Sequence, residues 1–425
     1  MLPSVCPKAS TTGAAVPRDP GCSCHASRRA AASAARPLQK ALTVRTLSSS
    51  LAGTVAEPRY TTGRIAARVP LVEALGRDPA VWEQLRERSG AASPFAGWAW
   101  HRAWADSASR EELEASCCIV LRDANGDAAA LLPVAVGTVT FRRQSVAGLR
   151  WAVGDVGCPD HLDVLADRSA DLEDALPALL ALPWEIAILS NLTPGAPNAV
   201  RLAAALARAG CAIRWNAGYR CPYLELPSTW EAYLSSLSAN RRQVLRRRER
   251  NLERDHVVAL TDYDSDRFVD GWRHLVALHE QRWATGGGGT FSDPRVERLH
   301  RAFAEELARR GQLWLTTLDL DGAPAAAWYG FADRETVYFY QSGRDTRWED
   351  KSVGVALMVK MIRRAIERGY RRFDFLRGNE AYKREWTISE AVTQELVAFR
   401  PGWRGRWLRG LDWAGRVRAR LRAGA

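Results

Sequence analysis

Three apolar runs in the second half of the chain constrain its fold more than any other feature. Asp321-Gly322 and Asp333-Arg334 provide tight turns between these runs, which therefore predict consecutive antiparallel strands. A helical pattern follows over 353–367 and ends at Gly369. Another strand is expected directly after this helix. The four strand-like runs are LWLTTL (313–318), PAAAWYGF (324–331), TVYFYQS (336–342) and residues 372–376.

The remaining segments predict further helices and strands in both halves. An Asn-Gly turn at 125–126 between two apolar runs indicates a β-hairpin. We therefore expect mixed sheets with covering helices. The other expected helices are 94–108, 169–182, 197–209, two stretches within 228–254, 265–284 and 294–310. The other expected strands are 117–121, 128–136, 184–189, 212–216, 257–261 and 395–399.

The chain length favours two folded domains with tails, because 425 residues exceed one ordinary domain. We expect an N-terminal domain over 69–218 and a C-terminal domain over 219–400. A disordered basic tail is expected over 1–68 and a basic Trp/Arg-rich tail over 401–425. The first tail lacks the apolar core of a secretory signal and resembles an organellar transit peptide in composition. A disordered tail or a start codon placed too far upstream are the plainer interpretations.

The positive charge of the chain is concentrated in these tails. Residues 1–68 contribute +8 and residues 400–425 contribute +7 to the total of +12, so the body over 69–399 carries −3. A duplex-binding protein is expected to carry its basic charge on a folded face. The distribution therefore predicts no nucleic-acid partner.

The eight cysteines form no pattern of paired CxxC motifs, so we expect no metal site and a reducing, cytoplasmic location. Most of them are interpreted as small buried residues. No apolar run approaches the roughly 20 residues that a membrane-spanning helix needs.

Four stretches of the second half resemble a known family. They are SANRRQVLRRRERNLE (238–253), LHEQRWATGGGGTF (278–291), YQSGRDTRWEDKSVGVAL (340–357) and FDFLRGNEAYKREW (373–386). With the order of strands and helices, they resemble the GNAT acyltransferase fold, and residues 237–386 look like the CelD/BcsL-type acetyltransferases associated with polysaccharide biosynthesis. The tryptophan-rich stretch from residue 94 and the hairpin after it extend the resemblance over about 69–400. The FemABX aminoacyl transferases share this twin layout.

The resemblance implies an α/β (α+β) fold of tandem GNAT-like acyltransferase domains, with mixed, mostly antiparallel sheets and flanking helices. It also implies an acyl donor, acetyl-CoA, at the start of helix 353–367. Free backbone N–H groups at a helix start attract phosphates, and a glycine lets the backbone approach them closely. The alternative is an ordinary helix start capped by its serine, since alanine replaces the second glycine of the family pattern. The expected donor-binding residues are Ser352, Val353, Gly354, Val355 and Ala356.

In GNAT folds the strands before and after this helix separate, and the donor lies in the gap. The stretch GNEAYKREW (378–386) is then expected at the mouth of the gap. Acyl transfer from a thioester needs a donor for the oxyanion and an acid for the thiolate. We expect Lys383 to donate to the oxyanion or to an acidic substrate group, Tyr382 to the leaving sulfur, and Asp374 or Glu380 to accept a proton. Alternatively, the lysine and tyrosine are ordinary exposed residues, and Asp374 only orients Lys383 or caps the turn.

The matching stretches also supply candidate acceptor-binding residues: Asn240, Arg241, Arg242, Arg282, Trp283 and Tyr340. The arginine-rich run 241–254 is either a solvated helix face or an attraction for an anionic acceptor such as a nucleotide-sugar or a polyprenyl-phosphate sugar. His279 is interpreted as structural. The glycines at 286–289 form either a substrate-gating loop or a linker.

The C-terminal stretch 402–424 places an apolar stripe on one side of a helix, with arginines around the rest. Its composition is that of an interfacial membrane helix, which gives peripheral contact with the inner membrane face as one expectation. Packing on the domain and a solvated tail are the alternatives. The stripe consists of Trp403, Trp407, Leu411, Ala414 and Leu421.

Taken together, the sequence and the resemblance predict an acyl-CoA-dependent N- or O-acyltransferase acting on a sugar-linked or other small acceptor. The sequence shows no Ser/His/Asp or Cys/His set for nucleophilic catalysis. We therefore expect direct transfer of the acyl group rather than a covalent enzyme intermediate. A FemABX-like aminoacyl-tRNA-dependent transferase is the first alternative. A non-catalytic scaffold of an exopolysaccharide assembly is the second.

Overall fold

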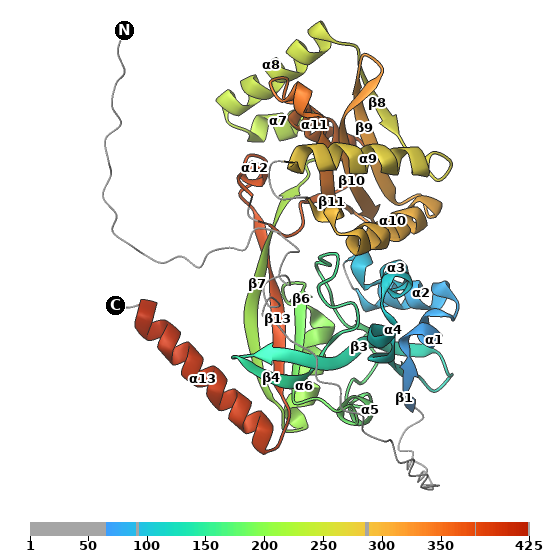
Figure 1. Ribbon diagram of the computed structural model, residues 1–425, viewed down its shortest axis with the longest axis vertical. Coiled ribbons are helices and arrows are strands. Elements are labelled where there is room, and N and C mark those ends of the chain that lie inside the picture. The colour runs from blue at the N-terminus through green and yellow to red at the C-terminus, as the bar shows by residue number, and fades with distance from the viewer. Residues whose placement is uncertain (1–64, 91–92, 285–288, 379, 424–425) are drawn as a thin grey trace, which may run out of the picture.

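The computed structural model describes residues 65–90, 93–284, 289–378 and 380–423. The expected N-terminal tail lies outside the described residues up to position 64, and its last four residues belong to strand β1 (Ile65–Pro70). Most of the expected glycine loop at 286–289 also lies outside them. Figure 1 shows two lobes, the first half of the chain below and the second above, with the long strands β7 (Ala212–Glu225) and β13 (Glu390–Phe399) running between them.

Two sets of strands flank β7 and β13. The first half contributes β2 (Ser116–Arg122), β3 (Ala128–Phe141), β4 (Gln144–Trp151), β5 (Leu165–Ala166) and β6 (Ile186–Leu192). The second half contributes β8 (Val258–Asp262), β9 (Leu313–Leu320), β10 (Ala323–Asp333), β11 (Thr336–Arg344) and β12 (Arg372–Asp374). The strands form a continuous path in the order β1-β2-β3-β4-β6-β13-β7-β12-β11-β10-β9-β8, with β5 beside β3.

The α-helices cover this path. In the first half they are α1 (Leu71–Leu75), α2 (Pro79–Ser89), α3 (Trp98–Ser107), α4 (Arg110–Glu114), α5 (Leu176–Leu180) and α6 (Pro197–Arg208). In the second half they are α7 (Trp230–Ser236), α8 (Ala239–Asp255), α9 (Phe268–Trp283), α10 (Pro294–Arg309), α11 (Val353–Glu367), α12 (Ala381–Arg384) and α13 (Trp403–Ala423).

The two halves repeat one arrangement. Strands β4 and β6 run parallel, and the connection between them contains α5. Strands β11 and β12 also run parallel, and α11 connects them. All other pairings between named strands are antiparallel among the described residues. Both halves therefore contain antiparallel neighbours followed by one parallel crossover.

Several elements differ from the sequence-based expectation: α2 and β4 were not expected, and β7 extends nine residues beyond the expected strand at 212–216. The helix expected over 169–182 is reduced to α5, because the side chains of Asp167 and Asp171 accept hydrogen bonds from backbone N–H groups two residues on and fold this segment into turns. Strand β13 begins five residues before the expected strand at 395–399 and lies between β6 and β7. The last strand of the chain thus completes the sheet of the first half.

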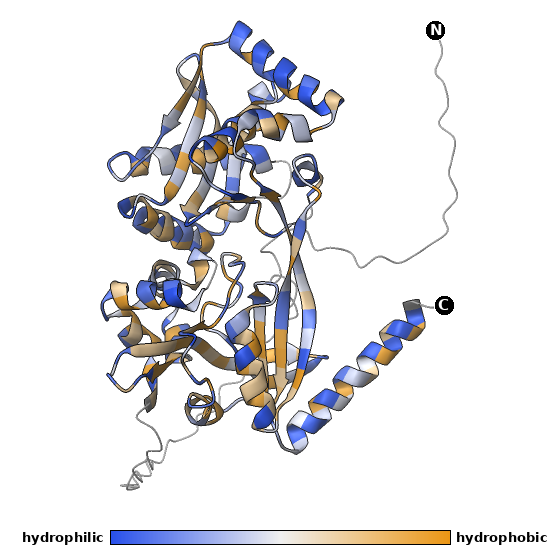
Figure 2. Cartoon of the chain, turned by 180° about the vertical axis from the view of Figure 1, so that it is seen from behind, coloured by the Kyte–Doolittle hydropathy of each residue, from blue (hydrophilic) through white to orange (hydrophobic). Residues whose placement is uncertain are grey.

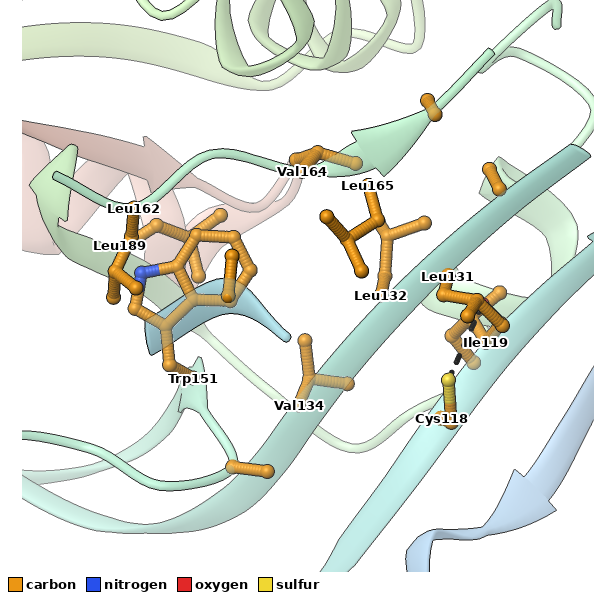
Figure 3. Packing of buried hydrophobic residues seen from close by; sticks show 14 of the residues in the cluster. Cys118, Ile119, Leu131, Leu132, Val134, Trp151, Leu162, Val164, Leu165 and Leu189 are labelled. Carbon is orange, nitrogen blue, oxygen red and sulfur yellow. Dashed lines mark hydrogen bonds between the residues drawn. The ribbon is translucent and has the colours of Figure 1, made fainter. Parts of the chain in front are cut away.

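One large apolar core fills the first half and extends into α10 and β10 of the second half, which also has apolar clusters of its own. In the first half, Trp151 of β4 lies beside Leu162 and Leu189 (Figure 3). In the second half, α11 packs on one face of the sheet and α9 with α10 on the other. Helix α3 packs against α10, and buried Arg86 of α2 pairs with Asp333 of β10 at 2.9 Å. These contacts fix one lobe against the other.

Candidate active site

Strands β11 and β12 separate at the centre of the second half. Their parallel pairing runs from Thr336 opposite Arg372 to Tyr338 opposite Asp374. Strand β11 continues to residue 344, whereas the chain after β12 turns away from it at Gly378. Gly378 has a φ of 124°, a backbone conformation that favours glycine. A wedge therefore opens between the two segments, and α12 lies after its turn. The resemblance to GNAT acyltransferases implied a donor gap between these same strands.

Tyr382 and Arg282 meet near this wedge, although they come from α12 and α9. The guanidinium carbon of Arg282 lies 5.7 Å from the Tyr382 ring centroid and 5.2 Å from that of Trp283. Its Nη1 donates a 2.6 Å hydrogen bond to Ser342 Oγ on β11. Burial raises the pKa of Tyr382 above its usual range. Its hydroxyl is therefore protonated at neutral pH and able to donate a hydrogen bond.

Lys383 is buried, and its ammonium group is surrounded by acceptors. Nζ lies 2.6 Å from the carbonyl oxygen of Arg377, 3.4 Å from that of Leu376 and 3.0 Å from Glu380 Oε2. Burial alone would lower its pKa, but the neighbouring Tyr382 and Glu380 raise it above the usual value. Because an ammonium has three N–H donors, these three acceptors occupy it. Lys383 thus holds the turn after β12 against α12.

Asp374 faces a histidine that the sequence analysis did not single out. Its Oδ2 lies 3.3 Å from His161 Nε2, and Arg372 Nε lies 3.4 Å away. Burial opposes ionisation of Asp374, but His161 and Arg372 hold its pKa below the usual value. Conversely, burial would lower the pKa of His161, but Asp374 raises it. The carboxylate of Asp374 therefore pairs with His161 and makes no hydrogen bond to Lys383.

His161 comes from an irregular segment of the first half. Its φ of 56° is in the left-handed region, which is uncommon for a residue other than glycine. The backbone N–H of Leu162 donates to the carbonyl of Asn191, and the buried carboxylate of Asp160 binds Arg377 at 2.7 Å. These neighbours hold the strained backbone. A single histidine without helical or strand periodicity gives no sequence signal for this role.

Arg377 joins the same segment to the end of β12. Besides Asp160, its guanidinium binds Asp155 and the carbonyl of Pro159, and it lies 4.3 Å from the Tyr219 ring centroid. The sequence suggested only a polar turn at this position. The structure shows a buried junction between the two halves.

A cleft of about 700 Å³ opens beside the His161–Asp374 pair. Residues of β11, β12 and β13 line it together with Thr193 and Pro194, which follow β6, so it lies between the halves. Nε2 of His161 has no hydrogen-bond partner among the described residues, and its contact with Asp374 is the 3.3 Å ion pair given above. The other charged and aromatic residues lining it are Tyr223, Asp333, Arg334, Glu335, Tyr338, Arg372 and Glu390.

The expected donor-binding residues lie at the start of α11. The side chains of Val353 and Ala356 are buried in the core, so only their backbone could face a ligand. A Cβ on Gly354 would meet nothing nearer than Arg344 Cδ at 3.9 Å, which leaves space over the first turn. Ser352 has φ 55° and makes no side-chain capping hydrogen bond, and Val355 is half-buried. The serine cap considered above is therefore wrong, and the backbone of the first turn has open space beside Gly354.

The expected acceptor-binding residues are dispersed. Arg241 lies over the ring of Trp386, at 4.9 Å from its centroid, and pairs with Glu385 at 2.8 Å. Arg242 instead donates to the carbonyls at the end of α7, and Asn240 is exposed. The hydroxyl of Tyr340 donates to the carbonyl of Gly157 at 2.9 Å. Of these residues, Arg282 contacts Tyr382 of α12, Arg241 contacts Glu385 and Trp386 directly after it, and Trp283 lies beside Arg282.

A family match identifies a GNAT-type acyltransferase domain within the second half of the chain. Residues 239–384 match the acetyltransferase (GNAT) domain family, so this part of the chain is a domain of that type. The predicted fold class, α/β with tandem GNAT-like domains, is confirmed by the repeated arrangement of strands and by this match.

Solved structures are similar to most of the chain at low identity. A conserved protein of unknown function from Bacteroides thetaiotaomicron has a TM-score of 0.50 and 12% identity, over 76% of this chain and 98% of that one. FemX has a TM-score of 0.49 and 12% identity, over 73% and 95%. A tandem GNAT protein from the clavulanic acid biosynthesis pathway has a TM-score of 0.39 and 12% identity, over 80% and 100%. The first of these likenesses supports the fold alone.

No protein of curated function matches the sequence of the chain. Within the described ranges, no group of three or more His, Cys, Asp or Glu side chains could hold a metal ion. Among the helices of the same ranges, none combines the length and apolarity needed to cross a bilayer. The five cysteines in these ranges are buried and form no disulfide with one another: Cys117, Cys118, Cys158, Cys211 and Cys221.

Proposed function

We propose that the chain transfers an acyl group, acetyl from acetyl-CoA, to a sugar-linked or other small acceptor. The observation that carries this proposal is the end of β11–β12 pairing at Tyr338 and Asp374, with Tyr382 and Arg282 together near the opening. The resemblance to CelD/BcsL-type acetyltransferases supports acetyl as the group and a polysaccharide precursor as the acceptor. The GNAT domain over 239–384 supports the reaction class.

The start of α11 is the proposed position for the donor phosphates. The first N–H groups of a helix have no intrahelical acceptor, and here they belong to residues 353 and 354. The space over Gly354 allows phosphate oxygens to approach this backbone. When bound, the thioester supplies an activated carbonyl and a thiolate leaving group.

Residues at the two ends of the wedge have different proposed roles. The Tyr382 hydroxyl donates a proton to the departing sulfur, for which its protonated state is suited. Lys383 is a positioning residue, because its ammonium binds the carbonyls of the turn and so orients α12. At the paired end, His161 accepts the proton of the acceptor nucleophile, and Asp374 orients and stabilises the imidazolium.

Direct transfer follows from these roles. The acceptor nitrogen or oxygen bonds to the thioester carbonyl carbon as its proton moves to His161. The carbon–sulfur bond then breaks, and the thiolate takes a proton from Tyr382. The cleft of about 700 Å³ beside His161 is the proposed acceptor site, since its polar lining suits a hydroxyl-rich or amine-bearing molecule.

Release of free thiol from acetyl-CoA tests this proposal. The full chain is incubated with acetyl-CoA and a panel of amino sugars and sugar alcohols, with a parallel reaction containing aminoacyl-tRNA. Acceptor-dependent thiol release is expected from acetyl-CoA. Transfer from aminoacyl-tRNA alone, or no thiol release with any acceptor, would contradict the proposed donor.

A further inference from the structure

Helix α13 follows β13 and runs along the outside of the molecule (Figure 1). One side of it is fixed to the body. Leu408 is fully buried, and the buried carboxylate of Asp412 pairs with Arg142 at 3.0 Å and with Arg214. Since Arg142 and Arg214 belong to the β3–β4 turn and to β7, the helix is held in a defined orientation.

The other side of α13 carries large apolar side chains that contact little. Trp403 and Leu421 are each 69% exposed, Trp413 is 63% exposed and Trp407 is 45% exposed. At about 100° per residue, Trp403, Trp407 and Leu421 fall in one narrow sector, opposite Asp412, and Trp413 lies about 80° to one side of it. Exposed aromatic side chains gathered on one helix face mark an interaction surface.

Arginines flank this apolar face. Helix α13 contains seven arginines and one acidic residue, Asp412, which gives it a charge of +6. Arg418, Arg420 and Arg422 make no ion pair with any described residue. Figure 2 shows hydrophilic and hydrophobic residues alternating along the helix. The surface therefore combines exposed tryptophans with unpaired positive charge.

We propose that α13 binds to the surface of an anionic lipid bilayer, with its tryptophan face at the level of the headgroups. Tryptophan favours this interface because its ring is apolar and its N–H group is polar. The flanking arginines complement anionic headgroups, and a helix of this charge lies on a membrane rather than crossing it. Asp412 fixes the helix so that the body lies on the side away from the lipid.

Co-sedimentation of the full chain with vesicles tests this assignment. Vesicles of phosphatidylcholine alone are compared with vesicles in which a third of the lipid is phosphatidylglycerol. The natural chain is expected to sediment with the anionic vesicles only, and less so at high salt. The variant W403S/W407S/W413S is expected to bind at least about tenfold more weakly. Its substitutions are all at exposed positions, so the fold is retained.

Two further variants separate the contribution of the tryptophan side chains to vesicle binding from that of the arginine charges. The control V257S/V269S/I388S removes equally exposed apolar side chains elsewhere and should bind like the natural chain. The variant R418Q/R420Q/R422Q should lose affinity and salt dependence together. Equal sedimentation of the tryptophan variant and the natural chain would overturn the proposal. The proposal would also be overturned if the natural chain did not sediment with anionic vesicles. A dimer formed through the tryptophan face, detected by light scattering, would be one such result.

Discussion

His161 Nε2 lies 3.3 Å from Asp374 Oδ2, although 213 positions of the chain separate the two residues. Both side chains are buried, and the pair lies where β11 and β12 stop pairing and where the cleft between the halves begins. The first half of the chain thus contributes a titratable group to the site of the second half. The proposed acyl transfer therefore depends on both GNAT-like halves.

Replacement of His161 by glutamine is expected to lower turnover about 10²-fold, because the proposed base is lost. Donor affinity should remain unchanged, since the start of α11 is untouched. The rising limb of the pH–rate profile should also disappear. Thiol release and calorimetry on the same preparation measure both effects. A variant with natural turnover would refute the role of His161 and leave donor binding intact.

The pair also predicts a pH-dependent stability. Asp374 has a lowered pKa, so its contribution is present above about pH 4 and is lost as pH falls through the lowered value. His161 has a raised pKa, so its contribution is complete below about pH 6.5 and is lost as pH rises through the raised value. The pair is therefore strongest between these limits.

The variant Asp374→Asn should accordingly lose about 3–5 kcal/mol of unfolding free energy in that window, as expected for a broken buried pair. The loss relative to the natural chain should be smaller at a pH above the raised pKa of His161, where the imidazole is neutral. Urea unfolding at both pH values measures it. An equal loss at both would show that His161 is not charged in the folded chain.

Lys383→Met and Lys383→Arg test whether this lysine positions the turn. Methionine removes the donors to the carbonyls of Leu376 and Arg377, and it leaves Glu380 without its cation. We expect turnover and stability to fall together in this variant and to recover partly with arginine. A collapse of turnover at full stability would instead indicate direct contact with the reacting carbonyl.

Tyr382→Phe should reduce turnover about 10²-fold without changing donor affinity, because only the proposed proton donor is removed. The effect should shrink with a donor whose leaving thiol is more acidic, since such a thiol needs less protonation. The same reduction with both donors would contradict the assignment of Tyr382 as the acid.

Arg377 is predicted to couple the two halves. Arg377→Met leaves Asp160 buried without its partner and should cost about 3–5 kcal/mol of unfolding free energy. Arg220→Met is the matched control, because its ion pair with Glu390 is largely exposed and should contribute at most about 1 kcal/mol. Similar losses in the two variants would argue against the junction at Arg377.

Local pattern was sufficient to predict much of the second half. The Asp-Gly turn at 321–322 and the apolar runs beside it predict β9, β10 and β11, and Gly369 marks the end of α11. The gap between β11 and β12 and the place of Tyr382 followed from the resemblance. Periodicity predicts elements well where each is regular and its neighbours are close in sequence.

The parts that sequence did not predict depend on distant pairings. Strand β13 completes the first half because its partners in β6 and β7 lie about two hundred residues earlier. His161 and Asp160 lie in an irregular segment whose conformation is set by Asn191 and Arg377. No local periodicity encodes such contacts. The sequence likewise did not predict the buried acceptors around Lys383, because the folded turn brings these backbone carbonyls to the ammonium group.

The central claim is that a phosphate-bearing acyl donor binds at the start of α11, and calorimetric titration of acetyl-CoA tests it most directly. Gly354→Asp is the informative variant, because its carboxylate has space, suits the first turn of a helix and repels phosphate. Gly410→Asp is the control, since this glycine also lies in a helix with open space around it. We predict micromolar binding by the natural chain and the control, and none by Gly354→Asp. Equal binding by all three, or no binding by the folded natural chain, would contradict the account.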